Sequence, residues 1–405
     1  MGAASYATVP DPAAISPASP APAHAVRRLT LTDFRCYERL RLETGGAPVV
    51  LTGPNGAGKT AILEALSYLA PGRGLRRARL GDIARRGAAA GWAVAARIER
   101  PGGGIVDVGT GTANAADADG DGGATERRAV RIAGSAARGP AALAEVLSIV
   151  WLTPRMDRLF IDAASGRRRF LDRLVYGFDA AHARRVTAYD RALRERGRLL
   201  QDGGASDSWL SALEETMAEL GVAVAAERRD TLARIEGALR RGVGPFPAAT
   251  LRLVGTVEGW LNEMPAVEVE AAFRAELREM RVRDAATGGA GIGPHRGDLA
   301  VRHLANDLPA DQCSTGEQKA LLIAIVLADV RIKAVREGGA PLILLDEVVA
   351  HLDGERREAL FAEIVALKGQ AWLTGTEASL FGGLVGHAEF LDVADGRVRG
   401  AGSGR

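Results

Sequence analysis

The sequence predicts an α/β fold, in which a mixed sheet with flanking helices is joined to a separate helical lobe. Three observations predict it. A glycine-rich loop stands between a strand-like run and a helix-like run near the N-terminus, and an apolar run ends in two acids near the C-terminus. Between them lie two long segments with helical periodicity. Apolar runs at both ends of the chain indicate that one sheet is assembled from distant parts of the sequence.

The glycine-rich loop follows the apolar run Val49–Leu51 and has the pattern of a phosphate-binding loop. It consists of Gly53, Pro54, Asn55, Gly56, Ala57, Gly58, Lys59 and Thr60. Glycines let backbone N–H groups turn toward a β-phosphate, and the N-terminus of the following helix points its positive end at the same oxygens. We therefore expect this loop to bind a nucleoside triphosphate, with Lys59 on the β- and γ-phosphates and Thr60 on a Mg²⁺ ion.

Lysine is almost absent from the chain, which carries only Lys59, Lys319, Lys333 and Lys368. A compact ammonium fits a phosphate cradle that a planar guanidinium does not, so a lysine retained in the loop fits a steric requirement. The excess of arginine and alanine fits codon bias in a GC-rich genome for most surface positions. Individual arginines are therefore weak indicators of function.

Length and composition set broad limits. With 405 residues, of which 47% are hydrophobic, the chain can bury a large core without metals or disulfides. Cys36 and Cys313 lack metal-ligand spacing, which favours a reducing cytoplasm. We find no run of membrane-spanning length and no secretion signal. Residues 1–25, rich in proline and alanine, are expected to form a disordered leader.

The net charge of +2 is small, but the arginines are clustered. The first cluster comprises Arg73, Arg76, Arg77 and Arg79, with Arg85 and Arg86 beyond; the second comprises Arg167, Arg168, Arg169 and Arg173; the third comprises Arg184, Arg185, Arg191, Arg194, Arg196 and Arg198. Such clusters can contact a nucleic-acid backbone or form a solvated helix face. The first cluster has few acids, so we predict DNA contacts at Arg73, Arg76, Arg77 and Arg79.

The second half of the nucleotide site is expected at the end of the apolar run 341–345. This run suits a strand buried on both faces, and it ends in Asp346 and Glu347. Open α/β sheets bind ligands at the carboxyl ends of their strands. We predict that Asp346 completes the Mg²⁺ shell and that Glu347 orients the attacking water as the catalytic acid-base group.

Residues 313–319 open a further apolar helix and offer Ser314, Gly316 and Gln318 for nucleotide binding. An ordinary helix cap would also explain Ser314 and Glu317, which have the spacing of a capping box. The motif precedes the acidic strand, and Asp353 follows that strand. This order resembles the signature helix, Walker B strand and D-loop of ATP-binding-cassette proteins, in which the signature of one subunit contacts the γ-phosphate held by the other.

The interval between the two halves is filled by helical sequence. Segments 168–200 and 209–239 carry apolar residues at helical spacing, and 201–206 has the composition of a turn. The pattern predicts an antiparallel helical hairpin, although a plain helical subdomain would give the same signal. We expect four parts: the leader 1–25, an N-terminal ATPase part 26–165, a helical arm 166–290 and a C-terminal ATPase part 291–405.

Several motifs together resemble the RecF family over nearly the whole chain after residue 26. They are Leu31–Tyr37, the phosphate loop with Leu63–Ala65, Arg168–Asp172, Gly293–Leu299, Ser314–Lys319 and Leu344–Glu347 through Leu352–Arg357. The stretch Gly-Pro-His-Arg at 293–296 is the most family-specific of them. The resemblance implies an ABC-type ATPase head with a short helical arm like that of SMC proteins, and it adds Arg35 to the predicted ATP-binding residues.

The resemblance also implies a function: a cytoplasmic, weak, DNA-stimulated ATPase of recombinational repair and replication-fork maintenance. Such a protein dimerises with ATP and Mg²⁺ on duplex, gapped or single-stranded DNA, works with RecR and RecO to load RecA, and supports the SOS response. Two rivals remain. A transporter ATPase would have a shorter interval between its motifs, whereas a DNA-binding scaffold that uses ATP only structurally is not separated by sequence.

Three departures from the family pattern stand out. Gly297 replaces a usual acid, and Cys36 replaces a usual asparagine. No histidine occupies the switch position in Thr374–Thr376, which predicts slow hydrolysis. Residues 102–123, rich in glycine, alanine and aspartate, are expected to be an insertion in a surface hairpin.

Overall fold

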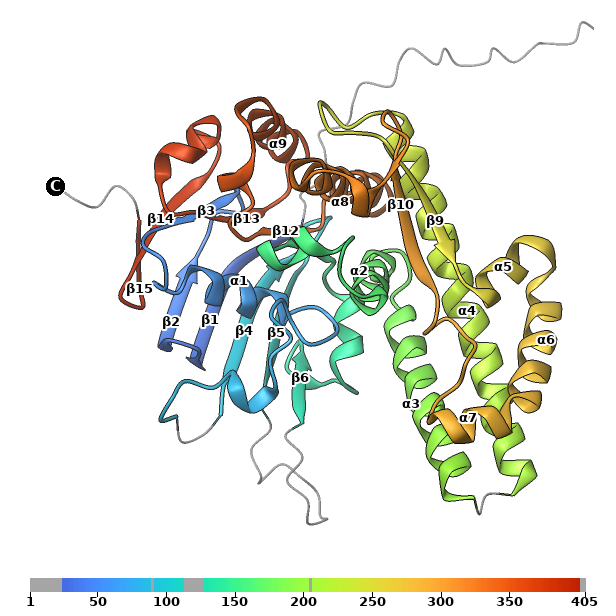
Figure 1. Ribbon diagram of the computed structural model, residues 1–405. Helices are drawn as coiled ribbons and strands as arrows, with labels where there is room; N and C mark the ends of the chain where they lie inside the picture. Colours follow the sequence, from blue (N-terminus) through green and yellow to red (C-terminus); the bar gives the residue numbers. More distant parts are fainter. Residues whose placement is uncertain (1–23, 89–90, 113–126, 204–205, 401–405) are drawn as a thin grey trace, which may run out of the picture.

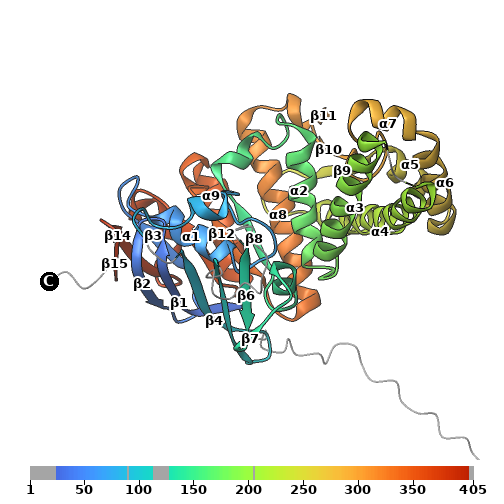
Figure 2. The same cartoon turned by 90° about the horizontal axis from the view of Figure 1, so that it is seen from below.

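The computed structural model describes residues 24–88, 91–112, 127–203 and 206–400. The predicted leader therefore lies almost entirely outside the described residues. A head built from two large sheets carries a helical lobe on one side (Figures 1 and 2). Helices α2 and α8 lie between the head and the lobe. This arrangement confirms the predicted α/β class and the separate helical lobe.

The nucleotide motifs sit on a six-stranded sheet whose strand order is β15-β14-β3-β13-β12-β8. Its strands are β3 (Val49–Thr52), β8 (Ile149–Leu152), β12 (Leu342–Leu345), β13 (Ala371–Thr374), β14 (Glu389–Ala394) and β15 (Arg397–Gly400). Every pair from β14 to β8 is parallel, and only β15 is antiparallel. The carboxyl ends of β3, β12 and β13 therefore meet at one edge.

Successive residues of these strands face opposite cores, as the period of two requires. In β3, Val49 and Leu51 pack with helix α1 (Lys59–Ser67), whereas Val50 packs with helix α8 (Thr315–Glu337) on the other side. Both faces are covered, which explains why these strands read as continuous apolar runs.

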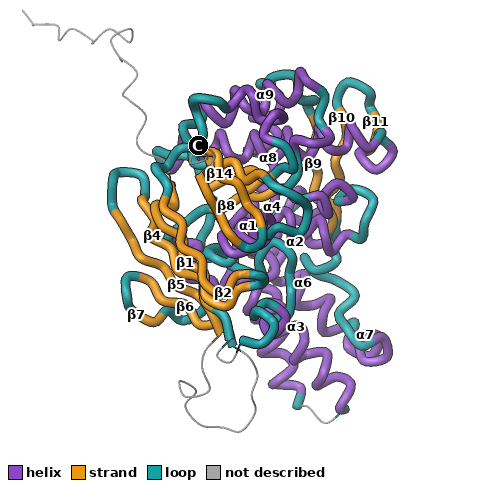
Figure 3. Tube along the Cα trace, turned by 90° about the vertical axis from the view of Figure 1, so that its left-hand side faces the viewer, coloured by secondary structure: helices purple, strands orange, loops and turns teal. Residues whose placement is uncertain are grey.

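Helix α1 is sandwiched between the parallel sheet and a second, antiparallel sheet of order β2-β1-β4-β5-β6-β7 (Figure 3). The strands of this second sheet are β1 (Ala25–Phe34), β2 (Tyr37–Glu43), β4 (Ala93–Glu99), β5 (Ile105–Thr112), β6 (Arg128–Ile132) and β7 (Ser135–Ala136). Eight of the nine α1 residues are buried, which fixes the helix and the phosphate loop before it.

The opposite face of the parallel sheet is covered by α8, by α9 (Gly354–Ala366) and by part of the lobe. Every residue of helix α8 from Gln318 to Val330 is buried, so this helix packs on all sides between the head and the lobe. A small sheet of β9 (Ala249–Val254), β10 (Asp298–His303) and β11 (Leu308–Pro309) packs on the same core.

The lobe contains the predicted antiparallel hairpin, formed by α3 (His182–Asp202) and α4 (Asp207–Arg240). Three shorter helices, α5 (Thr256–Glu263), α6 (Ala266–Glu279) and α7 (Arg281–Thr287), pack against it around a core of their own. Arg196 of α3 is fully buried and donates to Glu214 of α4 and Asp284 of α7. One cation therefore joins three helices of the lobe.

The structure corrects three expectations. Segment 168–200 is not one helix: α2 (Ala164–Tyr176) ends before α3 begins, and Gly177 between them packs so close to Lys333 that an added Cβ would lie 2.2 Å from the Lys333 Cε. Strand β9 falls inside the predicted arm, and it pairs with β10 across the boundary at residue 290. In the predicted insertion, residues 105–112 form β5 and 113–126 lie outside the described residues.

Cys36 and Cys313 are both free thiols. Within the described ranges, the helices are too short or too polar to cross a bilayer.

Candidate nucleotide and nucleic-acid sites

The phosphate loop has the backbone conformation that its glycines allow. Gly53, Gly56 and Gly58 have φ values of +137°, +82° and +113°, in the region that side chains disfavour. An added Cβ would lie 2.1 Å from the Val393 carbonyl oxygen at Gly53 and 2.5 Å from the Tyr37 hydroxyl at Gly58. The loop is thus clamped between β14 and the β1–β2 turn.

Lys59 folds back over the loop. Its Nζ donates to the carbonyl oxygens of Gly53 at 2.6 Å and Pro54 at 2.8 Å, and the side chain is buried. Burial lowers the pKa of this ammonium, while nearby Glu347 and Asp346 oppose the shift. An incoming phosphate would give this cation a far stronger acceptor than two neutral carbonyls.

The residues predicted to hold Mg²⁺ meet across the sheet. Thr60 Oγ1 at the start of α1 donates to Asp346 Oδ1 at 2.9 Å, although the two residues are far apart in sequence. Burial raises the pKa of the Asp346 carboxyl, and its hydrogen bonds with Thr60 and Thr374 oppose that rise. A hydroxyl and a carboxylate beside a phosphate loop fit Mg²⁺, which keeps most of its waters and takes few protein ligands.

Sequence reasoning missed Thr374, which orients both acids. Its Oγ1 donates to Asp346 Oδ1 at 2.9 Å and accepts from the Glu347 backbone N–H at 2.9 Å. Glu347 has a φ of +52°, which costs a non-glycine residue about 1 kcal/mol or more. The signal was available as a threonine ending a buried strand at the edge where the acids lie.

Arg35 lies beside α1 with its guanidinium engaged. Its Nε and Nη2 form a two-pronged ion pair with the buried Glu64, and Nη1 donates to the Asp82 carbonyl. The hydrogen bonds to Glu64 raise the pKa of Arg35. The structure therefore shows a brace between the β1–β2 turn and α1, and the predicted ATP contact of Arg35 stays a prediction.

The residues at the start of α8 fit both the helix-cap interpretation and the nucleotide-binding interpretation of their sequence. Ser314 caps α8 in a complete capping box with Glu317, as the helix-cap interpretation predicts. Ser314 and Gly316 are nevertheless exposed, and an added Cβ at Gly316 would meet nothing within 4 Å. An exposed helix N-terminus with free space before it can accept a phosphate from outside.

Gln318 and Asp353 differ from that exposed pair. Gln318 is 2% exposed and donates from Nε2 to the Cys313 carbonyl oxygen, so its side chain supports the turn before α8. Asp353 caps α9, accepting from the Arg356 backbone N–H at 2.8 Å. Their predicted nucleotide contacts remain untested.

The first arginine cluster occupies an irregular loop after α1 instead of a helix face. Leu75 N donates to Ser67 Oγ at 2.7 Å, and Arg128 Nη1 donates to the Gly72 carbonyl at 2.7 Å, which anchor the loop. Arg73, Arg76, Arg77 and Arg79 are all exposed. The only ion pair that they form among the described residues is a long one, 4.0 Å from Arg76 to Glu64.

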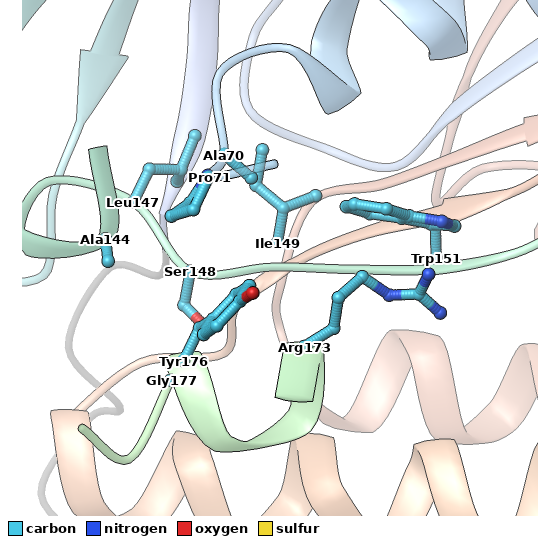
Figure 4. Close-up of a pocket in the computed structure, with 10 residues that line it drawn as sticks. All are labelled: Ala70, Pro71, Ala144, Leu147, Ser148, Ile149, Trp151, Arg173, Tyr176 and Gly177. Carbon is cyan, nitrogen blue, oxygen red and sulfur yellow. The ribbon is translucent and has the colours of Figure 1, made fainter. Parts of the chain in front are cut away.

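In the second and third arginine clusters, some members are engaged in contacts within the protein. Several members have structural partners: Arg167 with Asp298, Arg184 with Glu145, Arg185 with Asp179, and Arg196 as described. Arg173 stacks over Trp151, with Cζ 4.3 Å from the ring centre, beside a cavity of about 10 Å³ (Figure 4). That cavity holds no more than a water, so it is no ligand site.

Comparison with known proteins gives the family. The family model for the RecF/RecN/SMC N-terminal domain matches residues 25–377. The "DNA replication and repair protein RecF" of Mesorhizobium japonicum is 48% identical over 94% of this chain and 98% of its own length. The protein of the same name from Brucella suis is 47% identical over 93% and 96%.

Solved structures share the fold. The "recombination mediator protein RecF-ATPrS in RecFOR pathway" superposes with a TM-score of 0.81 at 18% identity, covering 94% of this chain and 99% of that one. An Smc head domain from Pyrococcus furiosus gives 0.52 at 16% identity, covering 93% and 95%. The head is therefore of the ABC ATPase type found in RecF and SMC proteins, and the chain belongs to the RecF family of DNA replication and repair proteins.

Proposed function

We propose that this RecF-family protein binds ATP and Mg²⁺, forms an ATP-dependent homodimer on DNA, and hydrolyses ATP slowly to release it. The observation that supports the proposal is the series of hydrogen bonds Thr60–Asp346–Thr374–Glu347, which links Glu347 to the first turn after the phosphate loop. The solved relatives bear on it through their printed names, one of which is RecF-ATP.

Each of the proposed site residues has a specific role in this function. Lys59 exchanges its two carbonyl acceptors for phosphate oxygens, and the backbone N–H groups of the loop hold the β-phosphate. Thr60 and Asp346 would hold Mg²⁺, which supplies charge neutralisation to the phosphates when bound. Glu347 orients water toward the γ-phosphate and accepts its proton.

We propose dimerisation because the two nucleotide motifs have different neighbours within one protomer. Ser314 is bonded to Glu317, which accepts from Asn306 between β10 and β11, whereas the phosphate loop is bordered by the β1–β2 turn and β14. We infer that the exposed Ser314 and Gly316 of one protomer contact the γ-phosphate held by its mate. Charge-assisted hydrogen bonds contribute about 1.5 to 3 kcal/mol each, and two symmetric sites would multiply their number.

In the cell, we propose that this dimer acts in the cytoplasm on gapped or duplex DNA, with RecR and RecO, to help load RecA onto the single strand. It would thereby support recombinational repair, replication forks and the SOS response. The pathway named for the solved relative supports this placement.

Phosphate release tests hydrolysis against the scaffold alternative. Wild-type protein should release phosphate slowly, faster with gapped duplex, and Glu347→Gln should abolish release while retaining ATP binding. The same slow rate in wild type and Glu347→Gln, with DNA binding intact, would instead identify a scaffold that uses ATP structurally.

The arginine loop is tested by salt dependence. Neutralising Arg76 and Arg77 together should reduce the slope of log K against log [salt] by roughly 2, since each lost phosphate contact contributes about 0.9. Binding should weaken similarly on unrelated sequences. An unchanged slope would show that the loop does not contact DNA.

A further inference from the structure

A basic groove lies on the lobe, away from the nucleotide motifs. It has a volume of about 350 Å³ and is lined by residues of α3 and of the segment that joins α7 to β10. Figure 1 shows where these two elements lie in the lobe. Its polar lining comes from Arg194, Arg198 and Gln201 of α3 and from His295 and Arg296 of the joining segment, with Gly288 and Gly289 between. No carboxylate is among its lining residues in the described ranges.

The groove lies where α3 faces the joining segment. An added Cβ at Gly197 of α3 would lie 3.7 Å from the Gly288 carbonyl oxygen, in ordinary van der Waals contact. His295 forms its floor, bonded to the Tyr189 hydroxyl at 2.7 Å and to the Ala290 carbonyl at 3.0 Å. Burial lowers the pKa of His295 to about 4, so the positive charge of the groove at neutral pH comes from the arginines.

The arginines of the groove are available to a ligand. Within the described residues, Arg194 and Arg198 make neither an ion pair nor a hydrogen bond, and Arg296 uses only its Nε, toward the Ala290 carbonyl. All three are exposed. The acids of α3 are Asp190, Glu195 and Asp202, and none of them lines the groove.

Further cations connect this groove with the head. Arg168 of α2 donates to the Gly297 carbonyl at 2.8 Å, next to Arg296 in the chain. The pKa of Arg168 is lowered by burial and by Arg228 and Arg296, and that of Arg169 by burial and by Arg77 and Arg168. The pKa of Arg77 is in turn lowered by burial and by Arg73 and Arg155. Arginines thus neighbour one another from the arginine loop to Arg296, which shares the groove with Arg194 and Arg198, and Asp172 and Asp298 lie beside Arg168.

We propose that Arg194, Arg198 and Arg296 form a second binding site for the DNA backbone, so that one duplex contacts both the head and the lobe. This inference rests on the proposed function and extends it from the arginine loop to α3. Three guanidinium groups around glycine backbone match phosphate oxygens, because arginine donates in pairs to such groups. Continuity with the arginines of the head favours a long polyanion over an acidic peptide.

The test is a salt titration of duplex binding by the full-length protein. The double variant Arg194→Ala/Arg198→Ala should bind a long duplex more weakly, with a slope of log K against log [salt] reduced by roughly 2. As the duplex is shortened until it reaches only the arginine loop, wild type and variant should converge. Circular dichroism checks that the variant is folded.

The matched control is Arg274→Ala/Arg278→Ala on α6, which lies on the other side of α4 from α3 (Figures 1 and 2). Both arginines are exposed, and they pair with Glu215 and Asp207. The control removes the same charge from the same lobe and should leave the slope unchanged.

The outcomes separate this inference from the proposed function. Wild type that fails to bind any DNA would overturn both. Wild type that binds DNA, loses slope in Arg76→Ala/Arg77→Ala, and shows equal slopes for the α3 variant and its control would overturn only the second site. Binding of an oligoglutamate peptide by wild type but not by the α3 variant, with unchanged DNA slope, would assign the groove to an acidic protein instead.

Discussion

At the scale of single residues, Thr374 links Asp346, the proposed metal-binding acid, to Glu347, the proposed catalytic acid. One hydroxyl serves both, as donor to Asp346 and as acceptor from the Glu347 N–H. Because Glu347 is held in a left-handed conformation, its backbone depends on that acceptor. The position of the acid is therefore fixed by a residue on the next strand of the sheet.

Replacing Thr374 by valine keeps the shape and removes the hydroxyl, so Glu347 should lose its position. We expect the ATPase kcat to fall by about tenfold or more, which corresponds to about 1.4 kcal/mol of lost transition-state stabilisation. Thr374→Ser retains the hydroxyl and is the control. Equal rates for valine and serine variants would show that the hydroxyl does not position the acid.

Glu258 occupies the space beside Gly297, the position where the family usually has an acid. Its side chain is 2% exposed, neither carboxylate oxygen has a hydrogen-bond partner among the described residues, and burial raises its pKa. An added Cβ at Gly297 would lie 2.4 Å from Glu258 Oε1. The carboxylate of Glu258 thus fills the space that a side chain at 297 would take.

Gly297→Asp alone should destabilise the protein by about 1 to 3 kcal/mol, because it overpacks the site and adds a like charge. Combining it with Glu258→Ala should recover part of that loss, with a coupling of about 1 to 3 kcal/mol in urea unfolding. Strictly additive effects of the two substitutions would contradict the inference that Glu258 and a side chain at position 297 compete for the same space.

At the scale of elements, α2 is fixed to the lobe by one buried carboxylate. Asp172 accepts from Arg228 of α4 at 2.8 and 3.0 Å and bonds with His182 of α3 at 2.9 Å. Burial opposes its ionisation, yet Arg228 and His182 prevail and lower the pKa of Asp172 to about 2. The ion pair therefore links three helices.

A depressed pKa gives a stability that is complete above the unfolded value near 4 and is lost as pH falls toward 2. We expect the free energy of unfolding to fall over this window by about 2 to 3 kcal/mol through Asp172. Asp172→Asn should remove this part of the pH dependence and destabilise by about 3 to 5 kcal/mol at pH 7. An identical pH profile in urea unfolding of the variant would contradict it.

Elements were predictable where local pattern decides them. The run before the phosphate loop and the run before Asp346 are strands β3 and β12, and the helical hairpin is α3 and α4. The close approach of Gly177, which follows α2, to Lys333 of α8 was not predictable, because the two residues are far apart in sequence. Strand β9 pairs with a partner beyond three helices, and its sequence carries no sign of that partner.

At the scale of the whole molecule, sequence motifs that lie far apart are assembled at one sheet edge. The pairing of Thr60 with Asp346 could be predicted, since both belong to recognisable motifs at strand or helix ends. The role of Thr374, the engagement of Arg35 by Glu64 and the groove on α3 depend on packing between distant segments. The motifs therefore indicated which distant segments meet at the sheet edge, and the side-chain contacts there depend on tertiary packing.

The central claim is that ATP joins two protomers, each of which contributes part of the proposed nucleotide site. Lys59→Ala should remove dimerisation, because the phosphates lose their cation, and Glu347→Gln should prolong the dimer, because hydrolysis no longer ends it. The most direct measurement is the mass of the protein by light scattering, with and without ATP and Mg²⁺, for wild type and both variants. The account predicts an ATP-dependent shift from monomer to dimer in wild type and Glu347→Gln but not in Lys59→Ala; a mass that is the same with and without ATP in wild type would contradict it.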